Sequence, residues 1–359
     1  MTGPGVLICV PTLQTGGAER QLRMLAPRLA SRGIRTALFS RIGDGDAAAL
    51  AAAGVRCFQA PRGHYSPRLL TALRAAAAAA KADVIHTFLP QMDVAGGAVA
   101  LLTRRPWLLS ERSSAAAYGT GFKDGLRFRM GRRATAIVAN SDAGLDVWSN
   151  HSDRLVIPNG IDHEAVSRAP PLSPADMAMA AGRTVIVAVA RLTETKRLDL
   201  VVEAVGRLVP AHPDLLLLLI GEGPDEAALT AQAVAFGDHV RLLGQREDVL
   251  SWLARADLFV SASVFEGHPN AVLEAAAAGV PMVLTDIPMH RGAVGPDGAR
   301  FVPIDDVSAL AGGLAAMLDG EGERRQCAEA AKRHVQPLSI DRAADLYAAL
   351  YRRLAAAGS

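Results

Sequence analysis

The 359-residue chain has little of what marks a disulfide-bonded, metal-binding or nucleic-acid-binding protein. Its three cysteines, Cys9, Cys57 and Cys327, are scattered without the paired spacing of metal ligands, so we expect reduced core residues in a cytosolic protein. The formal net charge is only +2, whereas nucleic-acid binding usually requires a strongly basic face. Aromatic residues make up only 4%, so the cores must rely on Ala, Leu and Val.

Long apolar runs are also missing. The N-terminal segment lacks a basic region, and its apolar run VLICV (6–10) is too short for a signal peptide or a membrane span. The run LLLLLI (215–220) is equally short. We therefore expect a cytoplasmic protein that is soluble or held peripherally at the inner face of the cytoplasmic membrane.

Short runs of β-branched residues and leucine alternate with longer Ala- and Leu-rich helical patterns. The runs are almost continuously apolar, which is typical of strands covered by helices on both faces of a parallel sheet. In the first half, the predicted strands are 6–10, 36–40, 82–88, 106–110, 135–141 and 154–159. In the second half they are TVIVAVARL (184–192), followed by LLLLLIG, HVRLLG, LFVSAS and PMVLTD.

The segment 164–183 contains three prolines and no strong period, which predicts a linker. Each half of the chain opens with a strand, a loop and a helix. We therefore predict an α/β protein with two Rossmann-like domains facing a cleft. Ligands of such sheets lie at the carboxyl ends of the strands, so the loops that follow strands are expected to carry the chemistry.

The first such loop is TGGAE (15–19), which opens a helix predicted over about 17–32. Gly16 and Gly17 allow the backbone to approach a ligand closely, and the helix N-terminus offers free N–H groups to an anion. An ordinary tight turn fits this short motif as well. It is not the three-glycine dinucleotide fingerprint, which counts against a dehydrogenase.

The equivalent loop of the second half is RLTETK (191–196). Its Arg191 and Lys196 suit a phosphate ligand, although two ordinary surface cations are the alternative. Two further loops follow strands: GEGP, with Gly221 in a turn, and GQRED, where the backbone of Arg246 is placed to meet a nucleotide base.

The stretch FEGHPNAVLEA (265–275) predicts a helix start between two glutamates. Pro269 suits the first helical position, because its missing N–H would have no partner there, and the helix should end at Gly279. The first-turn N–H groups lack partners within the helix and attract an anion. A diphosphate at this end would be neutralised by Arg191 and Lys196 opposite.

The two carboxylates of this stretch suit hydroxyl groups. Each carboxylate oxygen accepts hydrogen bonds and cannot donate them, so a carboxylate is a natural partner of vicinal hydroxyls. We expect Glu274 to accept from a ribose diol and Glu266 from the hydroxyls of a sugar.

With these motifs, the chain resembles the retaining glycosyltransferases of family 4 (group 1 type), which have the two-domain GT-B fold. The resemblance covers essentially the whole length. It is carried by TGGAE, IPNGID (157–162), ARLTETKRLDL (190–200), GEGP and FEGHPNAVLEAAAAGVPMVLTD (265–286). The paired glutamates make the last motif the most specific.

The resemblance implies an N-terminal acceptor-side domain over 1–165 and a C-terminal nucleotide-sugar-binding domain over 166–339. The helix IDRAADLYAALYRRL (340–354) resembles the crossover helix of the family, so 340–359 should pack back on the N-terminal domain. The catalytic residues would be Arg191, Lys196 and Glu266. The donor-binding residues would be Gly16, Gly17, Arg191, Lys196, Gly221, Arg246, Glu266, Gly267, His268, Pro269, Asn270, Ala271, Val272 and Glu274.

The chain departs from the family pattern at one position. Many members carry a histidine after the strand that PWLLS (106–110) matches, and Arg112 stands in its place here. Arginine is always charged, so it can bind a sugar or an acceptor but is a poor proton shuttle. His86 also faces the expected cleft, with a hydrogen-bonded strand-end histidine as the alternative.

No cofactor or metal is expected. The acidic pair in Asp44-Gly45-Asp46 is like that of metal-dependent sugar transferases, but its polar context favours a turn. The implied reaction moves a sugar from UDP or GDP to an acceptor hydroxyl with retention, and the leaving phosphate takes the acceptor proton. Electrostatic stabilisation of that phosphate is the main demand.

The basic segment 101–135 bears on the acceptor. It carries eight cations and two acids, and apolar residues interleave with the charges over 122–133. Such a stretch fits either an ordinary solvated helix or contact with an anionic membrane. The second interpretation favours a lipid-linked acceptor and a surface polysaccharide as product.

Two other classes of protein remain open. One is a GT-B relative with other chemistry, such as an epimerase or a phosphorylase, although no lysine motif for pyridoxal phosphate stands out. The other is a sugar-nucleotide-binding protein without turnover, which the missing histidine makes plausible.

Overall fold

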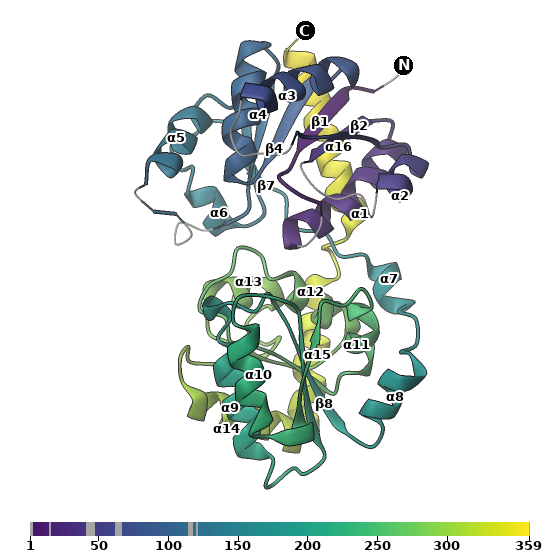
Figure 1. Ribbon diagram of the computed structural model, residues 1–359, viewed down its shortest axis with the longest axis vertical. Coiled ribbons are helices and arrows are strands. Elements are labelled where there is room, and N and C mark those ends of the chain that lie inside the picture. The colour runs from purple at the N-terminus through teal and green to yellow at the C-terminus, as the bar shows by residue number, and fades with distance from the viewer. Residues whose placement is uncertain are drawn as a thin grey trace. The chain divides into compact units, whose positions relative to one another are not determined.

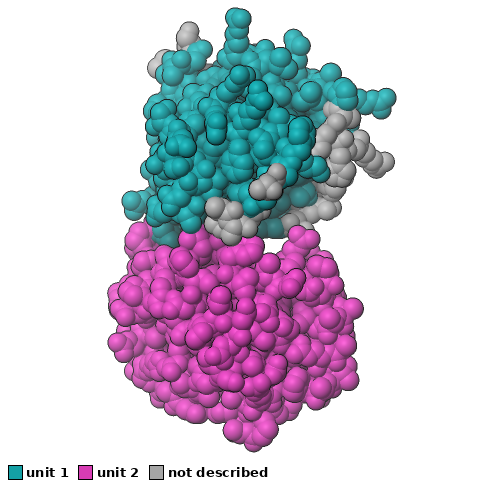
Figure 2. All heavy atoms as spheres, turned by 90° about the vertical axis from the view of Figure 1, so that its left-hand side faces the viewer, with its two compact units in different colours: residues 1–160, 338–359 teal, residues 161–337 magenta. Residues whose placement is uncertain are grey.

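The computed structural model describes residues 3–13, 16–40, 47–61, 67–113, 118–119 and 121–358. The chain divides into two compact units (Figure 2). Unit 1 consists of residues 1–160 and 338–359, and unit 2 of residues 161–337. Each unit is a parallel sheet between layers of helices (Figure 1), so the predicted fold class is confirmed.

Unit 1 contains a seven-stranded sheet in the order β3-β2-β1-β4-β5-β6-β7, and all neighbouring strands are parallel. Its strands are β1 (Gly5–Cys9), β2 (Arg35–Ser40), β3 (Arg56–Gln59), β4 (Val84–Phe88), β5 (Trp107–Glu111), β6 (Ala136–Ala139) and β7 (Arg154–Val156). The sequence did not predict β3. It is an edge strand whose residues are mostly exposed, so it lacks the apolar run that marked the others.

The helices of unit 1 are α1 (Gly17–Ser31), α2 (Ala47–Ala52), α3 (Pro67–Ala79), α4 (Pro90–Leu102), α5 (Phe122–Gly131), α6 (Asp142–Asp146) and α16 (Ile340–Ala357). Helix α1 has the predicted extent. Its apolar positions Leu22, Leu25 and Leu29 are buried at helical spacing, and Gly33 follows its end with φ 78°.

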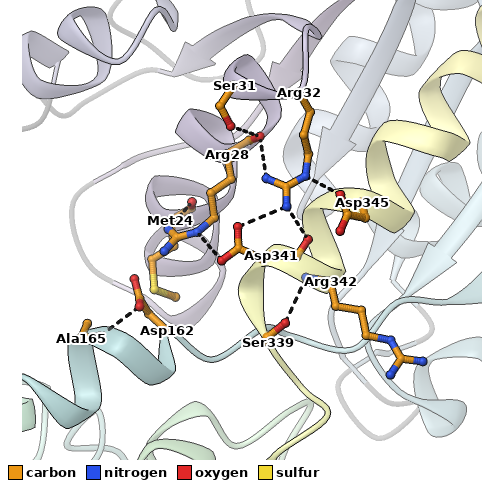
Figure 3. A network of polar contacts seen from close by, with 10 residues as sticks. All are labelled: Met24, Arg28, Ser31, Arg32, Asp162, Ala165, Ser339, Asp341, Arg342 and Asp345. Atoms are coloured by element: carbon orange, nitrogen blue, oxygen red, sulfur yellow. Dashed lines mark hydrogen bonds and ion pairs between the residues drawn. The ribbon is translucent and has the colours of Figure 1, made fainter.

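Helix α16 belongs to the core of unit 1, although it comes from the far end of the chain. Tyr347 and Tyr351 are buried with α1 and the central strands. Arg32 of α1 donates to Asp345 (2.6 Å) and Asp341 (3.1 Å) of α16, as Figure 3 shows. The apolar face therefore supplies most of the attachment, since exposed ion pairs contribute only about 0–1 kcal/mol each.

Unit 2 contains a six-stranded parallel sheet in the order β10-β9-β8-β11-β12-β13. Its strands are β8 (Thr184–Val189), β9 (Leu215–Ile220), β10 (Val240–Gly244), β11 (Leu258–Ser261), β12 (Met282–Thr285) and β13 (Arg300–Val302). Its helices are α7 (His163–Ser167), α8 (Pro174–Ala180), α9 (Leu198–Leu208), α10 (Glu226–Val234), α11 (Val249–Arg255), α12 (Asn270–Ala278), α13 (Pro288–Val294), α14 (Val307–Asp319) and α15 (Glu321–Val335).

The segment 164–183, predicted to be a linker, is folded. It contains most of α7 and all of α8, and each helix begins at a capping side chain. Asp162 accepts from the Ala165 N–H, and Ser173 accepts from the Asp176 N–H. Both helices are too short for a clear apolar period, which is why their pattern was not visible.

Within the described ranges, no helix combines the length and the apolar character that crossing a bilayer requires.

Candidate active site

The topology of unit 2 points to the carboxyl end of β8 as a candidate ligand site. Strand order runs outward from β8 to β9 on one side and to β11 on the other, so the connections reverse direction between β8 and β11. Open α/β sheets bind ligands at such a switch point. The loops after β8 and β11 are joined there, because the Val264 N–H donates to the Thr195 carbonyl at 3.0 Å.

An ion pair connects these two loops. Lys196 Nζ lies 2.5 Å from Glu266 Oε1, and the two side chains are only 19% and 15% exposed. Ser263 Oγ donates to the same carboxylate oxygen at 2.8 Å. Both bonds fall on Oε1, so the other oxygen of Glu266 is left for a further donor, such as a sugar hydroxyl.

The support for this pair reaches into the core. Thr285 Oγ1 donates to the Ser263 carbonyl at 2.6 Å. Below it, the ring of His290 is fully buried, with Nδ1 2.8 Å from the Thr285 carbonyl. Burial lowers the pKa of His290, so the ring is neutral and Nδ1–H donates to that carbonyl. Sequence reasoning missed Ser263, which its position two residues after the end of a buried strand and three residues before Glu266 could have revealed.

Arg191 differs from Lys196 in its surroundings. It is exposed in the loop after β8, and no other described residue forms an ion pair or hydrogen bond with its guanidinium. Of the two predicted phosphate-binding cations, one is therefore held by Glu266 and the other is available to an anion.

The glycines of GEGP pack against this loop. A Cβ at Gly221 would lie 2.0 Å from the Ala190 carbonyl oxygen, and one at Gly223 would lie 2.1 Å from that of Leu192. Only glycine permits this close approach. Gly221 thus shapes the loop that carries Arg191, and its contact with a donor stays a prediction.

Helix α12 directs its N-terminus to the same edge of the sheet. It begins at Asn270, so Pro269 is the N-cap residue and not the first helical residue as predicted. It ends at Gly279, which has φ 77°, where the sequence predicted the stop. Val272 and Glu274 are buried, with exposures of 1% and 6%. The other predicted donor contacts here, Gly267, His268 and Ala271, are partly exposed.

The guanidinium of Arg246 is engaged within the protein. It donates to Asp248 (2.8 and 2.7 Å) and to Asp176 of α8 (2.6 Å). These bonds raise the pKa of Arg246, and they lower the pKa of Asp248. The side chain therefore holds α8 to the loop after β10, and only its backbone remains to meet a base.

In unit 1, the predicted glycine loop lies at the start of α1. Gly16 has φ 149°, and a Cβ there would lie 2.2 Å from Glu19 Oε2. Gly17 is the first residue of α1. Burial raises the pKa of Glu19, and its carboxylate is turned back toward the loop. A side chain at position 16 would thus disturb the helix start, which explains this glycine without a ligand.

His86 is surrounded by protein on all sides. Its ring is fully buried, with Nδ1 2.7 Å from Tyr351 Oη and Nε2 2.7 Å from Ser110 Oγ. Burial and the charge of Arg112 hold the pKa of His86 well below its ordinary value. These contacts support the alternative of a hydrogen-bonded strand histidine, because neither ring nitrogen is open to a substrate in this conformation.

Arg112 follows β5 and is partly exposed. Its Nη1 donates to Asn159 Oδ1 at 2.8 Å, and its Nη2 donates to Tyr347 Oη at 2.9 Å. The guanidinium carbon lies 4.6 Å from the centre of the Phe88 ring. Tyr347 comes from α16, so the C-terminal helix fixes the position of this arginine. No local sequence pattern indicates Tyr347 as a partner of Arg112.

The basic segment is only partly a surface feature. Arg127 of α5 is 1% exposed and donates to Asp93 (2.7 Å) and to Glu111 (3.0 Å). By contrast, Phe122 is 86% exposed. The exposed cations of α5 and the following turn are Lys123, Arg129, Arg132 and Arg133.

One further motif, the acidic pair of Asp44 and Asp46, bears on a possible metal ion. Asp44-Gly45-Asp46 lies outside the described residues. Among the residues that are described, no group of three or more His, Cys, Asp or Glu side chains is arranged to hold a metal ion.

The two α/β units have the architecture of the GT-B class, and comparison with known families agrees. The model "Glycosyltransferase Family 4" matches residues 15–165, and "Glycosyl transferases group 1" matches residues 174–334. Together the two models cover most of the chain. The protein belongs to the group 1 glycosyltransferases of family 4, as the sequence predicted.

Curated relatives match parts of the chain. The phosphatidyl-myo-inositol mannosyltransferase of Mycolicibacterium smegmatis is 33% identical over 47% of this chain and 44% of its own length. The lipopolysaccharide core biosynthesis mannosyltransferase LpsB of Rhizobium meliloti is 28% identical over 62% of this chain and 67% of its own length. The matches thus span about half the length of the first of these relatives.

Solved structures share the fold over nearly the whole chain. HepE of Anabaena, in complex with UDP and glucose, has a TM-score of 0.83 at 17% identity, with 97% of this chain and 99% of HepE covered. Sucrose-phosphate synthase of Thermosynechococcus elongatus has a TM-score of 0.80 at 20% identity, with 99% and 100% covered. At this identity the likeness concerns the fold alone.

Proposed function

We propose that the protein transfers a hexose from a nucleotide-diphosphate sugar to the hydroxyl of a lipid-linked or surface-glycan acceptor, with retention and without a metal ion. The observation that carries this is the Lys196–Glu266 pair beside the exposed Arg191, at the switch point of the unit 2 sheet and before α12. The names of the curated relatives favour mannose as the first sugar to test.

The site suits a reaction in which a diphosphate departs. Arg191 and Lys196 are cationic, and the N-terminus of α12 carries the positive end of the helix dipole. Such groups stabilise negative charge as it develops on the leaving phosphate. An arriving diphosphate would compete with Glu266 for Lys196. The carboxylate released in this way, still held by Ser263, would accept from hydroxyls of the sugar.

The proton of the acceptor hydroxyl needs a base. The two candidates from unit 1 do not supply one, because His86 is buried with both nitrogens engaged and Arg112 is permanently charged. We therefore retain the proposal that an oxygen of the leaving phosphate takes this proton, on the face of the sugar from which the phosphate departs.

The surface of α5 supports a peripheral contact with an anionic membrane through 122–133. Phe122 is exposed, and four exposed cations lie within twelve residues, although Arg127 is turned inward. Cations and an exposed aromatic ring are what an anionic lipid surface attracts. Sedimentation with vesicles of phosphatidylglycerol, and its loss in the Arg132→Gln/Arg133→Gln variant, tests this part alone.

The decisive experiment combines binding and turnover. UDP and GDP are compared by thermal shift, since a ligand that binds only the folded state raises the unfolding temperature. Labelled UDP- and GDP-sugars, GDP-mannose first, are then assayed for slow hydrolysis and for transfer to lipid extracts. Binding without turnover would favour the non-enzymatic sugar-nucleotide binder, and conversion of the sugar itself would favour an epimerase.

The Lys196→Ala variant tests the role of the ion pair. We expect kcat/KM to fall by about a hundredfold or more, because one removed group that stabilises transition-state charge costs about 2.7–4 kcal/mol. Thermal unfolding must show that the variant is still folded, because the substitution also leaves the Glu266 carboxylate, which is 15% exposed, without its ion-pair partner. Turnover equal to that of the wild type would contradict the phosphate role.

A further inference from the structure

Arg112 carries a charge that the protein does not neutralise. Its partners are all neutral: an amide oxygen, a phenol oxygen, the Ser110 hydroxyl at 3.5 Å and the face of Phe88. Among the residues that the structure describes, no carboxylate forms an ion pair with it. Its Nε–H is buried and has no acceptor there either. The guanidinium is thus fixed in place by neutral groups, with donors to spare.

Another arginine of unit 1 shows what a structural role looks like in this fold. Arg127 is completely buried, and two carboxylates, those of Asp93 and Glu111, face it at 2.7 and 3.0 Å. Such compensation is expected, because a charge withdrawn from water is costly unless it is paired. Arg112 is withdrawn in part and has no such pair, so packing alone does not account for it.

The position of Arg112 is that of a ligand contact. It follows β5 directly, at the carboxyl edge of the unit 1 sheet, where open α/β sheets bind ligands. The neighbouring His86 is neutral, so it does not compensate the positive charge of Arg112, and it does not repel an anion that would. The planar guanidinium fork matches two oxygens of a phosphate group better than any other side chain does.

We propose that Arg112 binds a phosphate group of the acceptor, and that Asn159 and Tyr347 hold it in position for this contact. The inference rests on the proposed function and deepens it, because it restricts the acceptor to phosphorylated molecules. Both a phosphate borne by a lipid and a free phosphate ester carry the required chemistry.

The test uses the full chain with its donor site filled by the nucleoside diphosphate that binds better. Titration with glycerol 1-phosphate, followed by ³¹P NMR line broadening, measures the affinity for a free phosphate ester. Phosphatidic acid in neutral detergent micelles measures the affinity for a lipid-borne one. The wild type should bind at least one of the two.

The Arg112→Gln variant should lose that affinity by tenfold or more. Arg112→Lys should retain part of it, because lysine keeps the charge and loses the fork. Arg56→Gln is the matched control: Arg56 is exposed at the start of β3, donates to the Ala79 carbonyl and lies over Phe58, again with neutral partners. This control should bind like the wild type.

A second measurement separates binding from folding. Thermal unfolding of each variant, with and without the nucleoside diphosphate, reports whether both units remain folded. Unchanged phosphate affinity in a folded Arg112→Gln protein would overturn the inference, as would equal losses in Arg56→Gln. If the wild type bound no nucleotide, the proposed function would fail, whereas the phosphate titration would still decide the role of Arg112.

Discussion

At the residue scale, the candidate active site depends on side chains that fix other side chains. Ser263 has no contact with the exposed surface, since it is only 1% exposed, yet it donates to the carboxylate oxygen that Lys196 also contacts. Two donors on one oxygen leave Glu266 little rotational freedom. The position of the Glu266 carboxylate is therefore set partly by the buried Ser263, which lies beneath the charged pair.

We expect Ser263→Ala to lower kcat/KM for the sugar nucleotide by about tenfold, because a hydrogen bond to a charged group contributes about 1.5–3 kcal/mol. Nucleoside diphosphate without sugar should bind almost as before, since Glu266 is assigned to the sugar. Ser251→Ala is the control, because that hydroxyl of α11 is also buried but has no hydrogen-bond partner among the described residues. A Ser263→Ala enzyme with unchanged kcat/KM would show that Lys196 suffices to orient Glu266.

Asp93 gives the second prediction at this scale. Burial raises its pKa from 3.8 to about 6, although Arg127 and Thr87 act in the opposite direction. The folded protein thus keeps this proton while the unfolded chain has already lost it. As pH rises from about 4 to 6, the contribution of Asp93 to the unfolding free energy should therefore decrease.

Denaturant unfolding at several pH values measures this effect. The unfolding free energy of the wild type, relative to Asp93→Asn, should decrease between pH 4 and 6 and stay constant above. Asparagine keeps the shape and cannot titrate, so it removes the pH dependence of this one group. A relative stability that increases over the same interval would show that the ion pair with Arg127 outweighs burial.

At the scale of elements, the attachment of α16 depends on a glycine far away in the sequence. A Cβ at Gly160 would lie 2.3 Å from Ile340 Cα, at the start of α16. The Gln21 side chain of α1 also holds this turn, donating to the Gly160 carbonyl (2.9 Å) and accepting from its N–H (3.0 Å). Helices α1 and α16 therefore meet the turn after β7 without space for a methyl group.

We expect Gly160→Ala to destabilise unit 1 by about 1–3 kcal/mol, because backbone atoms must shift to admit the new methyl group. Gly312→Ala is the matched control. Gly312 lies exposed within α14, nothing lies within 4 Å of its added Cβ, and alanine there should stabilise by about 0.5–1 kcal/mol. Equal unfolding temperatures for the two variants would contradict the packing argument.

At the scale of the whole molecule, the chain contains two units with separate cores. The apolar cluster of unit 2 consists of its own strands and helices, and the residues 161–337 that form it are continuous in sequence. Unit 1 is discontinuous, since it needs α16 from the end of the chain. Unit 2 is therefore expected to fold when it is expressed alone, whereas residues 1–160 are not.

We expect a fragment of residues 161–337 to fold and to be stabilised by the same nucleoside diphosphate as the full chain. Ligand at a hundred times Kd contributes about 2.7 kcal/mol, a shift that thermal unfolding resolves easily. Residues 1–160 without α16 should remain partly unfolded. The fragment lacks Tyr347, Tyr351 and their apolar neighbours, and without them one face of the unit 1 core is exposed to water. If the fragment 161–337 folded but bound no nucleotide, unit 2 alone would not contain the donor site.

The sequence alone determined the class of fold and the loops in which the candidate site lies. Continuous apolar strands, the end of α12 at Gly279 and the loop positions of Lys196 and Glu266 all follow from local rules, because strand burial, helix termini and turn residues depend on neighbouring residues in the chain. The edge strand β3 and the short helices α7 and α8 were missed because they are too brief or too exposed for such rules.

Only the tertiary structure decided which charges are paired. It turned Arg127 inward between two acids, engaged Arg246 with Asp176 and enclosed His86 between Ser110 and Tyr351. It also left the guanidinium of Arg112 without an ion pair to any carboxylate in the described part of the chain. The bonded residues of these pairs are between 16 positions (Arg127 and Glu111) and 265 positions (His86 and Tyr351) apart in the sequence. Their proximity is produced by the packing of whole helices on a sheet, and no local pattern records it.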